Sequence, residues 1–187
     1  DVYGSADSWT DEAMTGAGFR GAWSELGISY RLPPDALPFS RKFAEMFLPK
    51  EMYNLPVAEQ LELPMYPCTL KWVQTTSQFA DAVCMEEIFL LASDANPDIL
   101  SIADITLLAQ KRTGGMEVVE LLIEKGVKCC HTFNLDSKES RRQKMGFYMG
   151  DARIKATTLH SFKGWESRSI VIFIDQLIDL KSRALFY

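Results

Sequence analysis

Hydrophobic and polar residues alternate along the chain in a way that predicts strands separated by helices. The predicted strands are short apolar runs at residues 26–31, 70–75, 104–110, 127–133, 152–158 and 169–175. The predicted helices, with apolar residues three and four apart, span about residues 34–47, 77–92, 115–125, 137–145 and 179 onwards. Strands alternating with helices predict an α/β fold with a mostly parallel sheet, in a single domain covering residues 1–187.

The pattern also predicts which faces are buried. In the helix over 34–47 the expected inward stripe is Leu37, Phe39, Phe43, Met46 and Phe47. In the helix over 77–92, Ser77 is the expected N-cap, and the expected inward residues are Phe79, Val83, Ile88, Leu90 and Leu91. Gly126 stands where a helix C-cap is expected, and the strands at 104–110 and 169–175 are apolar enough to be covered on both faces.

Composition places the chain among ordinary globular domains. It has 187 residues, of which 47% are hydrophobic and 24% charged, so disorder is not expected. No apolar run approaches the roughly 18 residues of a membrane span, and the first ten residues do not resemble a signal peptide. Four cysteines without C-x-x-C spacing favour a reducing, cytoplasmic setting.

Charge is unevenly distributed. Residues 1–100 hold six Lys and Arg against 15 Asp and Glu, whereas residues 101–187 hold 14 against ten. The basic residues concentrate between positions 136 and 168, and they are Lys138, Arg141, Arg142, Lys144, Arg153, Lys155, Lys163 and Arg168. Such a block suggests a face that meets an anion such as phosphate or nucleic acid, although a solvated helix face with an ordinary loop explains the same charges.

The densest polar cluster is the segment 157–166, which reads TTLHSFKGWE. It follows a predicted strand and contains hydroxyl, imidazole and ammonium groups together with Gly164, a residue that allows close approach of a ligand to the backbone. Backbone N–H groups with Ser and Lys suit a phosphate, and Glu166 can accept from a sugar hydroxyl. A capped turn without a ligand is the alternative.

This cluster resembles motif V of superfamily-one DNA helicases of the UvrD/Rep type, a Thr-x-His-x-x-Lys-Gly-x-Glu turn followed by a hydrophobic strand. Three further segments are similar to motifs of that family, in the same order. Residues 2–4 resemble the end of motif III, residues 29–31 the Tyr-Arg of motif IV, and residues 183–187 the opening of motif VI. The resemblance implies a three-layer RecA-like fold and the second, C-terminal motor domain of an ATP-dependent helicase or translocase.

The resemblance also implies roles for individual residues. Arg31 would be an arginine finger that reaches the ATP γ-phosphate, and Gly164 and Glu166 would contact the nucleotide, Glu166 through its ribose. The implied contacts to single-stranded DNA are Tyr3, Thr158, His160, Ser161 and Lys163. The implied cofactor is ATP with magnesium, and the implied partners are single-stranded DNA and an N-terminal RecA-like domain of the same protein.

Several departures qualify this prediction. No G-x-x-x-x-G-K-[ST] loop and no Asp-Glu pair after an apolar strand occur, so magnesium ligands are expected on the N-terminal domain and none in this chain. The chain reads as a fragment that does not hydrolyse ATP alone. In larger relatives a helical subdomain is inserted between the positions that match Arg31 and Thr158. The interval between these residues is short here, so that subdomain is expected to be absent or vestigial. The alternatives are a degenerate RecA-like module that binds DNA or a protein without motor activity, and a small-molecule-binding α/β domain.

One more cluster, Cys129-Cys130-His131, falls within a predicted strand. Because neighbouring strand residues face opposite sides, the three cannot hold one metal ion, and core cysteines are expected.

Overall fold

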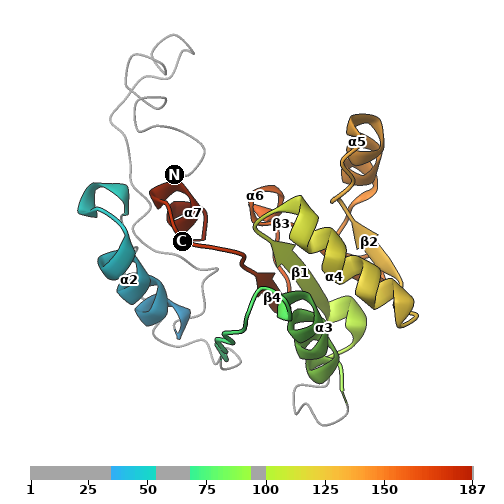
Figure 1. The fold of residues 1–187 in the computed structure, drawn as a ribbon, viewed down its shortest axis with the longest axis horizontal. Coiled ribbons are helices and arrows are strands. Elements are labelled where there is room, and N and C mark those ends of the chain that lie inside the picture. The colour runs from blue at the N-terminus through green and yellow to red at the C-terminus, as the bar shows by residue number, and fades with distance from the viewer. Residues whose placement is uncertain (1–34, 54–67, 94–99, 187) are drawn as a thin grey trace. The chain divides into compact units, whose positions relative to one another are not determined.

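A computed structural model describes residues 35–53, 68–93 and 100–186 of the chain (Figure 1). The predicted strand over 26–31 lies outside these residues. The chain divides into two compact units, one formed by residues 1–72 with 178–187 and the other by residues 73–177. The organisation of the chain into one domain stays a prediction.

The larger unit is built on a parallel sheet. Its strands are β1 (Ile105–Ala109), β2 (Cys129–His131), β3 (Ile154–Thr158) and β4 (Ser169–Phe173), in the order β2-β3-β1-β4. Every pairing is parallel, and Leu107 in β1 lies opposite Ala156 on one side and Val171 on the other. With its flanking helices this sheet confirms the predicted α/β class. The predicted strand over 70–75 is wrong, since the described residues 68–76 form no strand.

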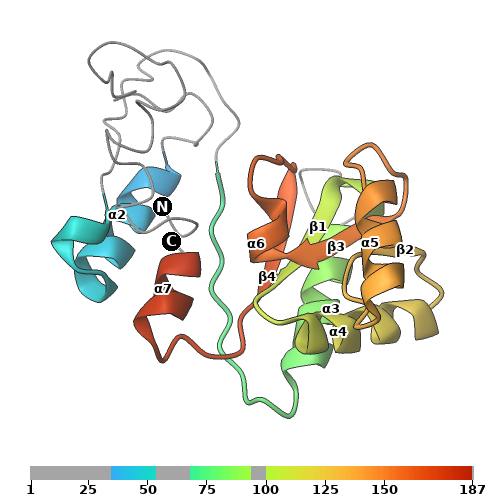
Figure 2. The same ribbon diagram turned by 90° about the horizontal axis from the view of Figure 1, so that it is seen from above.

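Two helices, α3 (Ala80–Leu91) and α4 (Arg112–Glu124), pack together against one side of the sheet (Figure 2). Their buried residues meet alternate residues of the strands, as the two-residue period of a strand requires. The fully or nearly fully buried members of this core are Cys84, Ile88, Ile105, Leu107, Ala109, Val118, Val119, Leu122, Phe133, Ile154 and Ala156.

The prediction for α3 was partly wrong. The helix begins at Ala80 after a turn, so Phe79 rather than Ser77 occupies the N-cap position, without a side-chain cap. Phe79 and Leu90 are exposed, contrary to expectation. Cys84 and Ile88, four residues apart, define the buried face, and Leu90 lies two residues beyond it on the opposite side of the helix.

Glycines fix both ends of α4. Gly126 has φ of 83°, and its N–H donates to the carbonyl of Ile123 at 2.9 Å, so the predicted C-cap is confirmed. Near the start of the helix, a Cβ on Gly115 would come within 2.5 Å of the Phe133 ring. The absence of a side chain there therefore lets α4 approach the segment after β2.

The other connections are α5 (Ser137–Gly146), which joins β2 to β3, and the short α6 (Leu159–Phe162), which follows β3 and contacts β1 and β3. A short 3-10 helix, η3 (Ile102–Asp104), precedes β1. β1 is buried throughout, as predicted, but in β4 Ile170 and Ile172 are about 40% exposed. The expectation that β4 is fully buried was wrong: β4 stands last in the order of the described sheet, and its residues are alternately half-buried and exposed.

The smaller unit contains α2 (Ala36–Phe47), the 3-10 helix η2 (Lys50–Met52) and α7 (Leu180–Phe186). Ala44, Leu48 and Ala184 form its core, and the ring of Phe43 packs on that of Phe186 at a centroid distance of 5.1 Å. The predicted stripe of α2 was wrong for Phe39, Met46 and Phe47, which are exposed. None of the helices described in either unit is long and apolar enough to cross a membrane.

Candidate functional site

The carboxyl ends of three strands meet at one edge of the sheet, which we call the carboxyl edge. Ala109, the last residue of β1, lies opposite Thr158 at the end of β3 and Phe173 at the end of β4. The segments that follow these strands therefore leave the sheet side by side. In parallel α/β sheets this is the edge where ligands bind.

The turn after β3 is held by its own polar residues. Thr158 is the N-cap of α6, and its Oγ1 accepts a hydrogen bond from the Ser161 N–H at 3.2 Å and donates one to Ser161 Oγ at 3.1 Å. Phe162 anchors the turn because its side chain is buried, and its carbonyl accepts from the Trp165 N–H at 2.9 Å. The predicted site residues Thr158 and Ser161 are thus brought into direct contact with one another.

The remaining predicted residues of this turn are exposed. His160, Lys163, Gly164 and Glu166 all lie at the surface. Gly164 has φ of 88°, a left-handed conformation that favours glycine, and a Cβ placed on it would have no neighbour within 4 Å. The turn therefore presents an imidazole, an ammonium, a carboxylate and an uncovered stretch of backbone within seven residues.

A brace joins the ends of β1 and β4 at the same edge. Gln110 Oε1 accepts from the N–H groups of Asp175 and Gln176, both at 3.2 Å, and its Nε2 donates to the Gln176 carbonyl at 2.8 Å. Lys111 forms an ion pair with Asp175. Sequence reasoning missed this brace, because its partners are more than 60 residues apart and follow no local spacing.

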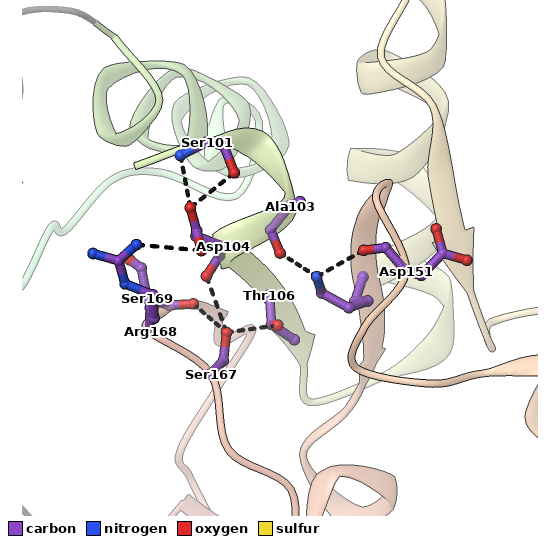
Figure 3. Close-up of polar contacts among 9 residues, drawn as sticks. Ser101, Ala103, Asp104, Thr106, Asp151, Ser167, Arg168 and Ser169 are labelled. Atoms are coloured by element: carbon purple, nitrogen blue, oxygen red, sulfur yellow. Dashed lines mark hydrogen bonds and ion pairs between the residues drawn. The ribbon is translucent and has the colours of Figure 1, made fainter. Parts of the chain in front are cut away.

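The opposite, amino edge of the sheet holds the polar cluster shown in Figure 3. Lys155 is only 1% exposed, and its ammonium donates to the backbone carbonyls of Ala103 and Asp151. Burial lowers the pKa of Lys155. This lysine therefore fastens the start of β3 to the segment before β1, and it is unavailable to an external anion.

The Asp104 carboxylate organises the neighbouring part of this cluster. It accepts from Ser101 Oγ at 2.8 Å and from the Ser101 N–H at 2.9 Å, and Arg168 lies 3.5 Å away (Figure 3). The Ser101 hydrogen bonds, helped by the positive charge of Arg168, hold the pKa of Asp104 below its usual range. Ser167 Oγ donates to the carbonyls of Asp104 and Ser169 at 3.1 and 3.0 Å, which ties β1 to β4.

Arg153 is neutralised in the same region. Its guanidinium donates to the Asp151 carboxylate through Nε at 2.9 Å and Nη2 at 2.6 Å, a bidentate pair. These hydrogen bonds lower the pKa of Asp151. Three of the eight basic residues between positions 136 and 168 thus have internal partners at the amino edge, namely Arg153, Lys155 and Arg168. For these three residues the structure shows structural contacts, so they do not support the anion-binding face that was one of the two interpretations of the basic block.

Cys129 and Cys130 have the burial expected of packing residues. Cys130 is buried and Cys129 is half-buried on the opposite face of β2. Burial raises the pKa of both thiols, that of Cys129 to about 11, and lowers the pKa of His131. A protonated thiol is a poor nucleophile and metal ligand, so the arrangement fits packing rather than chemistry.

Comparison of the chain with models of protein families, with curated proteins and with solved structures finds no match. Of the predicted site residues, Thr158, His160, Ser161, Lys163, Gly164 and Glu166 lie in one turn at the carboxyl edge. Tyr3 and Arg31 lie outside the described residues, and their roles stay predictions.

Proposed function

We propose that this chain is the second motor domain of an ATP-dependent translocase or helicase that acts on single-stranded DNA. The main support for this proposal is the location of the turn 158–166, which has the Thr-x-His-x-x-Lys-Gly-x-Glu order of helicase motif V. It follows β3, next to the fully buried strand β1, at the edge where parallel sheets bind ligands. RecA-like architecture, a cytoplasmic location and an N-terminal partner domain belong to the same proposal.

In this proposal the turn holds the DNA backbone. Lys163 supplies an exposed positive charge, His160 an exposed ring with hydrogen-bonding nitrogens, and Gly164 an open stretch of main chain. Thr158 Oγ1 accepts from the Ser161 N–H and donates to Ser161 Oγ, so the Thr158 hydroxyl shapes the turn, and the Ser161 hydroxyl proton remains to be donated to a phosphate.

In this proposal the same turn also contacts the ribose of a bound nucleotide. Glu166 is an exposed carboxylate two residues after Gly164, a group that accepts hydrogen bonds from ribose hydroxyls. ATP would supply the phosphoryl group whose hydrolysis drives movement, and Arg31 is the proposed stabiliser of the charge on that group. No magnesium ligands are proposed in this chain, and they are assigned to the N-terminal motor domain.

The DNA-binding part is tested by Lys163→Ala in the full-length protein. Loss of one phosphate contact should weaken binding of a fluorescent oligothymidylate about fivefold near 0.1 M salt, measured by fluorescence anisotropy. Lys128→Ala is the matched control, since Lys128 is exposed beside the start of β2 at the amino edge. Unchanged binding by the Lys163 variant would remove the DNA contact from the proposal.

The motor part is tested by Arg31→Ala in the same protein. DNA-stimulated ATP turnover should fall by about 10³-fold or more while oligothymidylate binding stays near normal, as expected for an arginine finger. If the unaltered full-length protein binds DNA without hydrolysing ATP, the alternative of a DNA-binding module without motor activity replaces the motor.

A further inference from the structure

Helix α5 has two faces of opposite character. Ser140, Gln143 and Phe147 recur at intervals of three and four residues and lie towards the body of the unit, with Ser140 and Phe147 buried. The other face carries residues with the same helical spacing, namely Lys138, Arg141, Arg142 and Met145, all of which are exposed. Residues at positions i, i+3, i+4 and i+7 share one helix face, so these four form a continuous stripe, the α5 stripe.

The positive charge of the α5 stripe is not cancelled locally. Glu139 makes a single distant contact with Arg142 at 3.8 Å, and no acidic side chain among the described residues pairs with Lys138 or Arg141. The Asp136 carboxylate is occupied as the N-cap, where it accepts from the N–H groups of Lys138 and Glu139 at 3.0 and 2.9 Å. This contrasts with Arg153, Lys155 and Arg168, which have internal partners.

Large apolar side chains are exposed beside this charge. Met145 is 82% exposed within α5, and Leu135 and Tyr148, which lie just before and just after the helix, are 74% and 59% exposed. A helix face that is only solvated has no need of exposed apolar groups, whereas a surface for single-stranded nucleic acid combines cations with side chains on which bases stack or rest.

The α5 stripe adjoins the turn after β3. β2 and β3 are neighbouring parallel strands, so α5 and α6 begin at the same edge of the sheet, and both lie beyond the same end of the strands in Figure 1. Phe147, directly after α5, packs against Trp165 of the turn, with ring centroids 6.3 Å apart in an edge-to-face arrangement. A direct packing contact therefore connects the two segments.

We propose that the α5 stripe is a second contact for the backbone of single-stranded DNA, continuous with the turn 158–166 through Phe147, Trp165 and Tyr148. The inference rests on the proposed DNA-binding function of that turn and extends the strand's path from it to α5. Charge complementarity selects a polyanion, and the exposed Tyr148 and Met145 select unpaired bases over a closed duplex.

The experiment uses the full-length protein and the double variant Lys138→Gln/Arg141→Gln. Glutamine keeps an unbranched polar side chain and a similar helix propensity, so folding should be kept, as checked by circular dichroism and thermal unfolding. Loss of two phosphate contacts should weaken binding of an oligothymidylate of about 20 nucleotides by about 10- to 30-fold near 0.1 M salt. The control is Lys125→Gln/Lys128→Gln, which removes two exposed charges at the amino edge and should bind like the unaltered protein.

The outcomes separate this inference from the proposed function. Weaker binding by both the α5 double variant and Lys163→Ala supports both. Weaker binding by Lys163→Ala alone overturns the α5 contact and keeps the proposed function. Weaker binding by the α5 variant alone overturns the contact at the turn, and with it the continuous path. Equal weakening on a duplex of the same length overturns the assignment to single strands.

A second variant probes the stacking element. Tyr148→Ala removes an exposed ring without changing charge, so it should weaken oligothymidylate binding about 5- to 100-fold if a base stacks there. The salt dependence of binding should stay unchanged, because no phosphate contact is lost. Unaltered affinity would exclude Tyr148 from the path and restrict the contact to the cations of α5.

Discussion

The cationic side chains at the two edges of the sheet differ in what they contact. At the amino edge, Lys155 and Arg168 face carbonyls or carboxylates of the same chain, and their charges are satisfied internally. At the carboxyl edge, Lys163 and Arg141 lie at the surface of the turn after β3 and of α5. In the folded chain, some basic residues between positions 136 and 168 therefore stabilise the sheet, whereas others lie where they can contact a ligand.

The largest expected effect is on stability, at the amino edge. Lys155→Ala removes a buried side chain and leaves two carbonyls without their donor, so the free energy of unfolding should fall by about 2–5 kcal/mol in urea denaturation. Lys155→Met keeps the volume and removes the charge, and it should lose less. If Lys155→Ala is as stable as the unaltered protein, the internal role of this lysine is wrong.

Gly164→Ala should have the next largest effect, and it acts at the other edge. A left-handed conformation costs a residue with a Cβ about 1–2 kcal/mol, and no neighbour would clash with the added carbon. Thermal unfolding measures this loss, and oligothymidylate binding should weaken as the turn relaxes. The matched variant Gly126→Ala, at the end of α4, should show a similar loss of stability with normal DNA binding. Equal effects of the two variants on DNA binding would contradict the division between edges.

Asp104→Asn should lower stability by about 1 kcal/mol at neutral pH, because charge-assisted bonds from Ser101 and Arg168 become ordinary ones. The folded-state pKa of Asp104 lies below the unfolded value of about 3.9, so its contribution is present above pH 4 and is lost as the pH falls through the folded pKa. Urea unfolding of both proteins should therefore show a difference that shrinks below pH 4. A difference independent of pH would contradict the assigned role of the carboxylate.

Lys111→Gln should have the smallest effect. The ion pair with Asp175 is largely exposed, and such pairs contribute about 0–1 kcal/mol. DNA affinity should change less than for Lys163→Ala, because the Lys111 charge is already compensated although it lies at the carboxyl edge. A loss of affinity as large as that of Lys163→Ala would show that the ion pair with Asp175 does not keep Lys111 from contacting DNA.

Much of the fold could be predicted from local sequence pattern. Which basic residues lie at the amino edge and which at the carboxyl edge could not. The apolar run at 105–109 and the glycine after α4 are short-range signals, and both predictions are confirmed. The buried state of Lys155 depends on carbonyls at residues 103 and 151, which only the strand order brings together. The exposure of Ile170 and Ile172 likewise depends on the place of β4 in the sheet.

The candidate site, too, could be predicted only in part from the sequence. The motif order predicted the residues of the turn after β3, and the structure places six of them together at the carboxyl edge. The charges of α5 were visible as a basic block, but the pattern could not separate them from Arg153 and Arg168. That separation requires the carboxylates of Asp151 and Asp104, which are supplied by loop geometry and not by helical spacing alone.

Lysine footprinting compares the cations at both edges of the sheet in a single experiment. The full-length protein is acetylated with and without a saturating oligothymidylate, and each lysine is quantified by mass spectrometry. We expect that Lys138 and Lys163 become protected by DNA, that Lys125 and Lys128 react equally in both states, and that Lys155 reacts in neither. Protection of Lys125 and Lys128 with unchanged reactivity at Lys138 and Lys163 would contradict the account.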